Sequence, residues 1–174
     1  YNVDDDLRLA RLAEPNAVYA ERTWHLRTIV EDVFNGGLTI SLDADSKTQI
    51  IFQNTDMALH HLWFNKAYWN NTILDQGPIG DDIEVEIDSS GMYHILYTNS
   101  AEGELRLLKF NDTIETRQVL ARGSTVTSAI GMDLDTNDVG QITYSKSDGL
   151  GNNTISLLRS LSGKDTGRID PDPK

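Results

Sequence analysis

The sequence predicts an all-β fold made of a four-stranded antiparallel unit that is repeated along the chain. The aromatic residues Phe52, Tyr97 and Tyr144 each end a short predicted strand, and they are separated by 45 and 47 residues. In residues 83–87, aliphatic side chains alternate with glutamates, which is the period of a strand with one buried face. Asp- and Gly-bearing turns separate the strands. Repeats of this length are typical of β-propeller blades, because one unit alone cannot bury its apolar face.

The units share one strand order. First strands are predicted at residues 38–42, 83–87 and 129–134, and each second strand ends at one of the three aromatic residues. Third strands are expected at residues 59–63, 105–109 and 155–159. Fourth strands are expected at residues 72–75 and 114–120. A partial N-terminal copy has its third and fourth strands at residues 6–11 and 24–30, so we expect about three and a half blades.

These strands predict a domain organisation for the whole chain. We expect a partial blade, three blades and a polar C-terminal tail, at residues 1–37, 38–82, 83–127, 128–161 and 162–174. Propellers usually close with about four to eight blades, so a stack of this size leaves apolar sheet faces at its ends. Three possibilities stay open: two chains close one ring, the remainder of a longer propeller completes it, or the array is short and open. The first two are favoured.

Composition excludes several classes of function. The chain of 174 residues has 27 acidic and 15 basic residues and a net charge of -12, so nucleic acid is not an expected partner. It contains no cysteine, which excludes a disulfide framework. No apolar run is long enough to predict a membrane span. Glycosylation sequons begin at Asn70, Asn111 and Asn152, and they favour an extracellular or cell-surface location.

The best preserved repeat resembles a known family. Residues 87–97 contain an Asp-Ser-Ser-Gly turn and a His-Ile-Leu-Tyr strand, and residues 103–108 read Gly-Glu-Leu-Arg-Leu-Leu. This pattern is similar to the repeats of sialidase-like (BNR-type) β-propellers, and parts of it recur over residues 1–161. The resemblance implies a blade architecture that serves glycosidases, lectins and protein-binding scaffolds. The enzymes of this class hold a substrate carboxylate with three arginines, a cluster that cannot be assembled from the pattern of this sequence.

A polar column on the second strands is the first candidate ligand-binding site. Gln49, His94 and Gln141 each lie three residues before the aromatic residue that ends the strand. Such a column is expected either to line a channel and bind a polar ligand or to hydrogen-bond the neighbouring blade. Recurrence in every copy favours the structural role, because a catalytic residue is usually unique to one blade.

The second candidate binding site is aromatic. The connection at residues 64–71 is predicted to be the longest loop between a third and a fourth strand, and Tyr68 and Trp69 lie in it. Rings of this kind form stacking platforms for a sugar or a peptide. A polar column on the third strands is expected to face solvent; its members are Arg8, His60, Arg106 and Ser156.

A possible calcium site is the third candidate. Asp133, Asp135 and Asn137 place oxygen ligands at alternating positions, as calcium loops do, although the loop has no glycine at its sixth position. The alternative is a solvated turn. No other cofactor is predicted.

These features predict a non-enzymatic binding or scaffold module that presents its loops to a glycan or protein ligand. One alternative is a fragment of a sialidase-like or other glycoside hydrolase propeller. Another is a structural assembly unit in which strands of one chain complete blades of another. The expected partners are therefore a glycan or protein, together with a second copy of the chain or the remainder of a longer propeller.

Overall fold

The structure is a computed structural model that describes residues 6–12, 24–31, 36–65, 67–111, 115–123, 126–147, 150, 152–160 and 169–171. These residues form strands and turns without any helix, so the predicted all-β class is confirmed for them. The chain divides into two compact units, Tyr1–Asn35 and Gly36–Lys174.

In the N-terminal unit, β1 (Leu7–Leu12) pairs antiparallel with β2 (Trp24–Val30). Both strands were predicted from the alignment with later repeats. Tyr1 lies outside the described residues.

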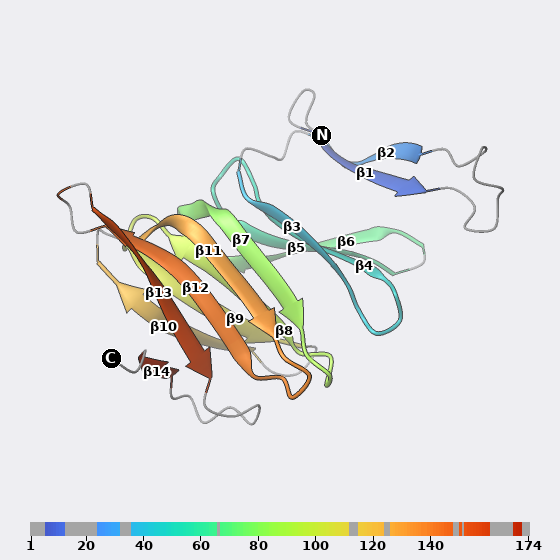
Figure 1. Cartoon of the computed structure of the whole chain (residues 1–174). Coiled ribbons are helices and arrows are strands. Elements are labelled where there is room, and N and C mark those ends of the chain that lie inside the picture. Colours follow the sequence, from blue (N-terminus) through green and yellow to red (C-terminus); the bar gives the residue numbers. More distant parts are fainter. Residues whose placement is uncertain are drawn as a thin grey trace. The chain divides into compact units, whose positions relative to one another are not determined.

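The second unit consists of three four-stranded antiparallel sheets, shown in Figure 1. Sheet I contains β3 (Leu38–Leu42), β4 (Thr48–Gln53), β5 (Leu59–Phe64) and β6 (Trp69–Asp75). Sheet II contains β7 (Ile79–Ile87), β8 (Tyr93–Asn99), β9 (Glu104–Phe110) and β10 (Glu115–Arg122). Sheet III contains β11 (Val126–Leu134), β12 (Gly140–Ser147), β13 (Asn153–Ser160) and β14 (Ile169–Pro171). In each sheet the strands pair in chain order.

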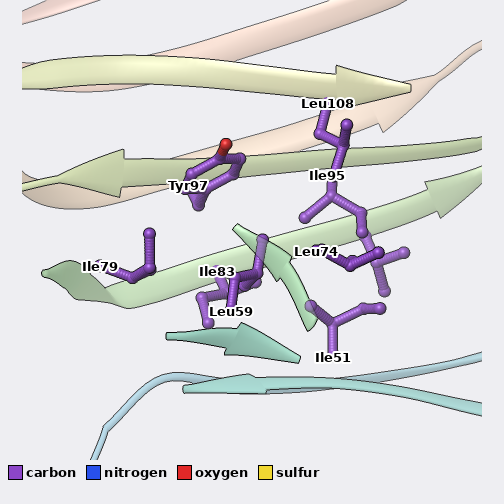
Figure 2. Close-up of a cluster of buried hydrophobic side chains, with 9 residues drawn as sticks. Ile51, Leu59, Leu74, Ile79, Ile83, Ile95, Tyr97 and Leu108 are labelled. Carbon is purple, nitrogen blue, oxygen red and sulfur yellow. The ribbon is translucent and has the colours of Figure 1, made fainter. Parts of the chain in front are cut away.

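The sheets pack on each other through their alternating apolar residues. Ile51 and Leu59 of sheet I are buried with Ile83, Ile95 and Leu108 of sheet II in one core cluster, shown in Figure 2. A second cluster joins sheets II and III; its buried members are Leu96, Leu105, Leu107, Ile142, Tyr144 and Leu158. The strand β7 lies against β3 and β4, and β11 lies against β7 and β8. The first strands β7 and β11 therefore each cover the preceding sheet.

Several strand limits differ from the predicted ones. Residues 64–71 were predicted to form a loop, and this was wrong because Phe64 belongs to β5 and Trp69 begins β6. The cause is Asn65, whose side-chain oxygen accepts the backbone N–H groups of Ala67 and Tyr68 and closes a tight turn. The strand β7 begins at Ile79, four residues earlier than expected.

The C-terminal segment also differs from its prediction. Residues 162–174 were predicted to form a polar tail, whereas the described part of that segment contains β14, which pairs with β13. The pairing of Ile169 with Ser160 and of Asp170 with Arg159 supplies sheet III with a fourth strand. The division of the chain into blades at residues 37, 82, 127 and 161 stays a prediction.

One aspartate closes the hairpin between the first and second strands of each of sheets I, II and III. Its side-chain oxygen Oδ1 accepts the backbone N–H groups two and four residues later, at 2.8–3.0 Å; the aspartates are Asp43, Asp88 and Asp135. The residue three positions later has a positive φ of 59°, 81° and 60°; these residues are Ser46, Gly91 and Asp138. Asp and Gly were predicted in these turns for this chemistry.

Replacing Asp88 with alanine should therefore destabilise the chain. The substitution leaves the N–H groups of Ser90 and Met92 without their acceptor, and it removes the Asp88 contact to His94. We expect a loss of about 2 kcal/mol in the free energy of unfolding, measured by urea denaturation.

The matched control is Asp45→Ala, which removes a surface carboxylate that pairs with Lys47. This change should cost less than about 1 kcal/mol. If both variants lost the same free energy of unfolding, the hydrogen bonds of Asp88 would not be what stabilises the hairpin.

Candidate functional site

The predicted polar column occupies the position directly after these turns. Gln49 Nε2 donates to Asp43 Oδ2 at 2.9 Å, and His94 Nε2 lies 3.0 Å from Asp88 Oδ2. Both side chains are buried. Asp43 and Asp88 belong to the same sheets as Gln49 and His94. Neither bond is therefore the expected hydrogen bond to a neighbouring blade. Gln141, the third member, is exposed.

The turn of sheet II also fixes the charge of Asp88 and the position of the proton on His94. Partial burial would by itself raise the pKa of Asp88, but hydrogen bonds from Ser90, His94 and Met92 outweigh burial and lower that pKa to about 2. Because Asp88 is then ionised, His94 Nε2 carries the proton and donates it. Gln49 and His94 are thus each held by the aspartate of the turn that precedes them.

An aromatic cluster joins sheets I and II at the end of the sheets where these turns lie. The His61 ring stacks on Trp63 with the centroids 4.7 Å apart, and it contacts Tyr93 and Phe110 of sheet II at 5.4 and 5.2 Å. His61 Nε2 donates to Gln49 Oε1 at 2.8 Å. Burial lowers the pKa of His61 to about 4, so this ring is neutral at neutral pH.

The predicted aromatic platform lies at the same end of sheet I. Pairing of Gln49 with Trp63 and of Phe64 with Trp69 places the β5–β6 turn beside the aspartate turn of β3 and β4. The Trp69 ring contacts Phe64 at 5.4 Å, and Tyr68 is 62% exposed at the tip of the turn. The structure therefore brings Tyr68 and Trp69 together, on a short turn and a strand end.

One donor in this region lacks a partner. The Nδ2 atom of Asn70 is buried and has no hydrogen-bond partner among the described residues. Asn70 pairs with Trp63 in the sheet, so this donor belongs to the aromatic end. A buried N–H group without an acceptor is costly, and an ordered water or a ligand oxygen would satisfy it.

The predicted calcium ligands Asp133, Asp135 and Asn137 lie at the end of β11 and in the turn that follows it, and a calcium site there stays a prediction. The Asp135 carboxylate accepts the N–H groups of Asn137 and Val139 and closes its own turn. Asp133 is exposed beside Glu86, whose pKa is raised by burial and by the Asp133 charge. Within the described residues, no group of three or more His, Cys, Asp or Glu side chains is placed to hold a metal ion.

Asp138 of the same turn makes a contact that was not predicted. Its carboxylate accepts the backbone N–H of Ser89 at 2.9 Å and the Ser89 hydroxyl at 2.5 Å. Because Ser89 lies in the hairpin turn of sheet II, the bond ties the turns of two neighbouring sheets together.

The predicted solvent-facing column on the third strands was wrong for two of its members. His60 is buried, where it packs on Phe52 and lies 2.9 Å from Asn71 Oδ1. Arg106 is largely buried in an ion-pair network between sheets I and II. Alternation along a strand indicates two faces, but it does not show that both faces are covered.

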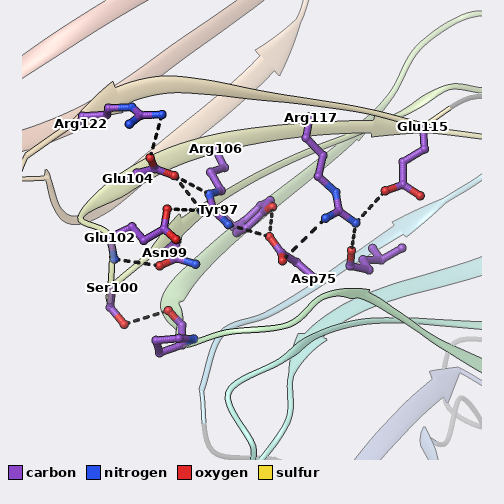
Figure 3. A network of polar contacts seen from close by, with 12 residues as sticks. Asp75, Tyr97, Asn99, Ser100, Glu102, Glu104, Arg106, Glu115, Arg117 and Arg122 are labelled. Carbon is purple, nitrogen blue, oxygen red and sulfur yellow. Dashed lines mark hydrogen bonds and ion pairs between the residues drawn. The ribbon is translucent and has the colours of Figure 1, made fainter.

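That network surrounds Asp75 at the opposite end of the sheets, as Figure 3 shows. Asp75 is 7% exposed, and it accepts hydrogen bonds from the Tyr97 hydroxyl at 2.6 Å and from Arg106 Nη1 at 3.0 Å. Arg117 Nη1 lies 3.9 Å from its other oxygen. Burial and the Asp75 carboxylate raise the pKa of Tyr97, so its hydroxyl stays protonated as a donor.

Each arginine of this network faces carboxylates. Arg106 also contacts Glu104 at 2.7 Å and Glu102 at 2.8 Å. Arg117 pairs with Glu115 at 2.7 Å, and Arg122 pairs with Glu104 at 3.2 Å. The pKa of Glu104 is lowered by these guanidinium groups. A substrate carboxylate would have to displace protein carboxylates, so the geometry favours a structural clamp between sheets.

Comparison with known proteins gives no family. No protein-family model and no curated protein matches the chain. Among solved structures, a fucose lectin from Kordia zhangzhouensis, in complex with methyl-fucoside, is similar over 79% of this chain and 99% of the lectin chain. The sequence identity is 16% and the TM-score is 0.49. The described part of the chain has no apolar helix of membrane-spanning length.

Replacing Asp75 with asparagine should be strongly destabilising. The change removes the carboxylate charge that accepts hydrogen bonds from Tyr97 and Arg106 across the two sheets, while Glu104 and Glu102 still pair with Arg106, so we expect a cost of about 2–3 kcal/mol. Urea denaturation measures this loss. The control is Glu102→Gln, which removes a 59% exposed partner of the same arginine and should cost less than about 1 kcal/mol. Similar costs for both variants would exclude the clamp.

His61 should make stability fall in mild acid. Between its ordinary pKa of 6.5 and its folded value of about 4, only the unfolded chain binds the proton, so the free energy of unfolding falls as pH falls. His61→Gln should reduce this slope in urea denaturation measured from pH 7 to pH 4. Above pH 7 the difference in the free energy of unfolding between the unmodified chain and His61→Gln should not change with pH. If the free energy of unfolding of the two proteins showed the same dependence on pH between pH 7 and pH 4, a buried neutral His61 would be contradicted.

Proposed function

We propose that this chain is a non-enzymatic binding module with the architecture of a partial β-propeller, and that the aromatic end of its sheets binds a glycan. The observation that carries this proposal is the exposed ring of Tyr68 on the turn closed by Asn65, directly before Trp69, whose own ring packs on Phe64. An exposed aromatic group held on a tight turn is pre-organised for binding.

The propeller part of the proposal rests on the order of the sheets. Each sheet of the second unit is a meander in chain order, and β7 lies against both β3 and β11. In a propeller the first strands of successive blades surround one axis, and the blades pack face to face. The resemblance of residues 87–97 to sialidase-like (BNR-type) repeats supports the same architecture.

The glycan part rests on the chemistry of the aromatic end. Sugar rings present apolar C–H faces that stack on Tyr and Trp, and hydroxyl groups that need polar partners. Asn70 offers a donor that has no partner among the described residues. Because Trp69 packs on Phe64, Tyr68 is the ring most available to a ligand.

The hydrolase alternative receives less support from the same structure. The arginines that converge at Asp75 are paired with protein carboxylates. A binding role requires no nucleophile or general acid. We place the module outside the cell or at the cell surface, where glycans are displayed, in agreement with the exposed sequon at Asn152.

The test is a glycan array probed with the labelled full chain, followed by calorimetry with the best glycan. Tyr68→Ala should weaken binding by about tenfold or more, because an anchoring aromatic residue contributes over about 1 kcal/mol. The control is Val119→Ala, which truncates an exposed side chain on β10 and should leave the affinity unchanged.

Two results would overturn the proposal. The first is an array on which no glycan is bound above background. The second is a Tyr68→Ala variant that binds the same glycan with the affinity of the unmodified chain.

A further inference from the structure

Sheets I and II of the second unit each present the same face to the sheet that follows. We define the forward face of a sheet by five equivalent positions on its second and third strands. In sheet I these are Gln49, Ile51, Gln53, Leu59 and His61; in sheet II they are His94, Leu96, Thr98, Leu105 and Leu107. All of these residues are buried. In sheet III the equivalent residues are Gln141, Thr143, Ser145, Ile155 and Leu157.

The forward face of sheet III is the uncovered member of the series. Ile155 is 83% exposed and Leu157 is 43% exposed, whereas the equivalent Leu59 and Leu105 are fully buried. Gln141 and Thr143 are exposed as well. Sheet III thus exposes aliphatic side chains at positions that are buried in sheets I and II. Such an exposed apolar face indicates a surface that packs against another element.

The molecule shows what covers such a face. The forward face of sheet I packs against β7 of the next sheet, through Ile83 and Val85. The forward face of sheet II packs against β11, to which Ile130 and Met132 belong. A forward face is therefore covered by a first strand with aliphatic residues at two alternating positions.

The chain itself carries one more strand of this kind. Leu38 and Ile40 of β3 occupy the positions of Ile83 and Val85, two residues apart and at the same distance from the turn aspartate. They are 45% and 57% exposed, whereas Ile83 and Val85 are both buried. The second unit thus contains, in β3 and in the forward face of sheet III, both halves of an interface that it forms twice internally.

We propose that the forward face of sheet III is a self-association surface, which a second copy of this chain covers with its strand β3. Because two different surfaces meet, the contact is head-to-tail, and repetition of the contact closes a ring or extends an array. The chain has a net charge of -12, which opposes association of two copies. The five forward-face residues of sheet III carry no charge, and Leu38 and Ile40 carry none either.

The first test is the mass of the chain in solution, measured by light scattering after size-exclusion chromatography over a range of concentrations. The unmodified chain should exceed its single-chain mass of 19.4 kDa and dissociate on dilution. Ile155→Glu should shift the protein to the single-chain mass, because it places a carboxylate in the apolar contact. Val119→Glu is the matched control, since it changes a β-branched exposed residue on β10 and should keep the larger mass.

The second test uses the absence of cysteine from the chain. One preparation carries Ile40→Cys and another carries Ile155→Cys, and each should keep the circular dichroism spectrum of the parent. After oxidation, a disulfide-linked dimer should form chiefly in the mixture of the two preparations. A chain that stays at 19.4 kDa at all concentrations would overturn the proposal. So would cross-linking of Ile155→Cys only with itself, because that result indicates a symmetric contact.

Discussion

The burial of sheet II between its neighbours is the interaction on which the rest of the second unit depends. Strand β7 turns Ile83 and Val85 toward sheet I, and β8 turns Leu96 toward sheet III. Each fully buried aliphatic side chain contributes about 1.5–3 kcal/mol, and sheet II supplies such side chains on both faces. This packing brings His61 against Tyr93 at one end and Asp75 against Tyr97 at the other. The candidate site and the charged clamp are consequences of one packing arrangement.

Acidic residues have two structural roles in this chain. Because part of the negative charge has a structural role, the net charge does not indicate a function. The aspartates at 43, 88 and 135 close hairpins with their side-chain oxygens, and local N–H groups compensate their charge. Asp75 is buried and is compensated by arginine and tyrosine from the next sheet. A buried ion pair contributes little net stability, yet losing one partner is costly, so Asp75 is best understood as fixing how sheets I and II meet.

Features that depend on local chemistry were predictable from the sequence. Alternation in residues 83–87 predicted a strand with a buried face, and the Asp and Gly residues predicted the turns. The burial of His60 and the length of β6 were missed, because the first depends on covering both faces of sheet I and the second on the Asn65 turn.

The Asp75 network could not have been predicted, because its members come from three strands of sheet II and one of sheet I. Asp75 and Arg106 are 31 residues apart, and no spacing rule connects them. The same limit applies to the forward face of sheet III. Its apolar character is visible in the sequence, but its exposure is a property of the folded chain.

The packing of sheet I on sheet II is tested most directly by nuclear Overhauser effects between labelled methyl groups. The account predicts cross-peaks that join Ile51 and Leu59 of sheet I to Ile83, Ile95 or Leu108 of sheet II, since these side chains share one core. A spectrum in which the methyl groups of each sheet show cross-peaks only within that sheet would contradict the stacked arrangement.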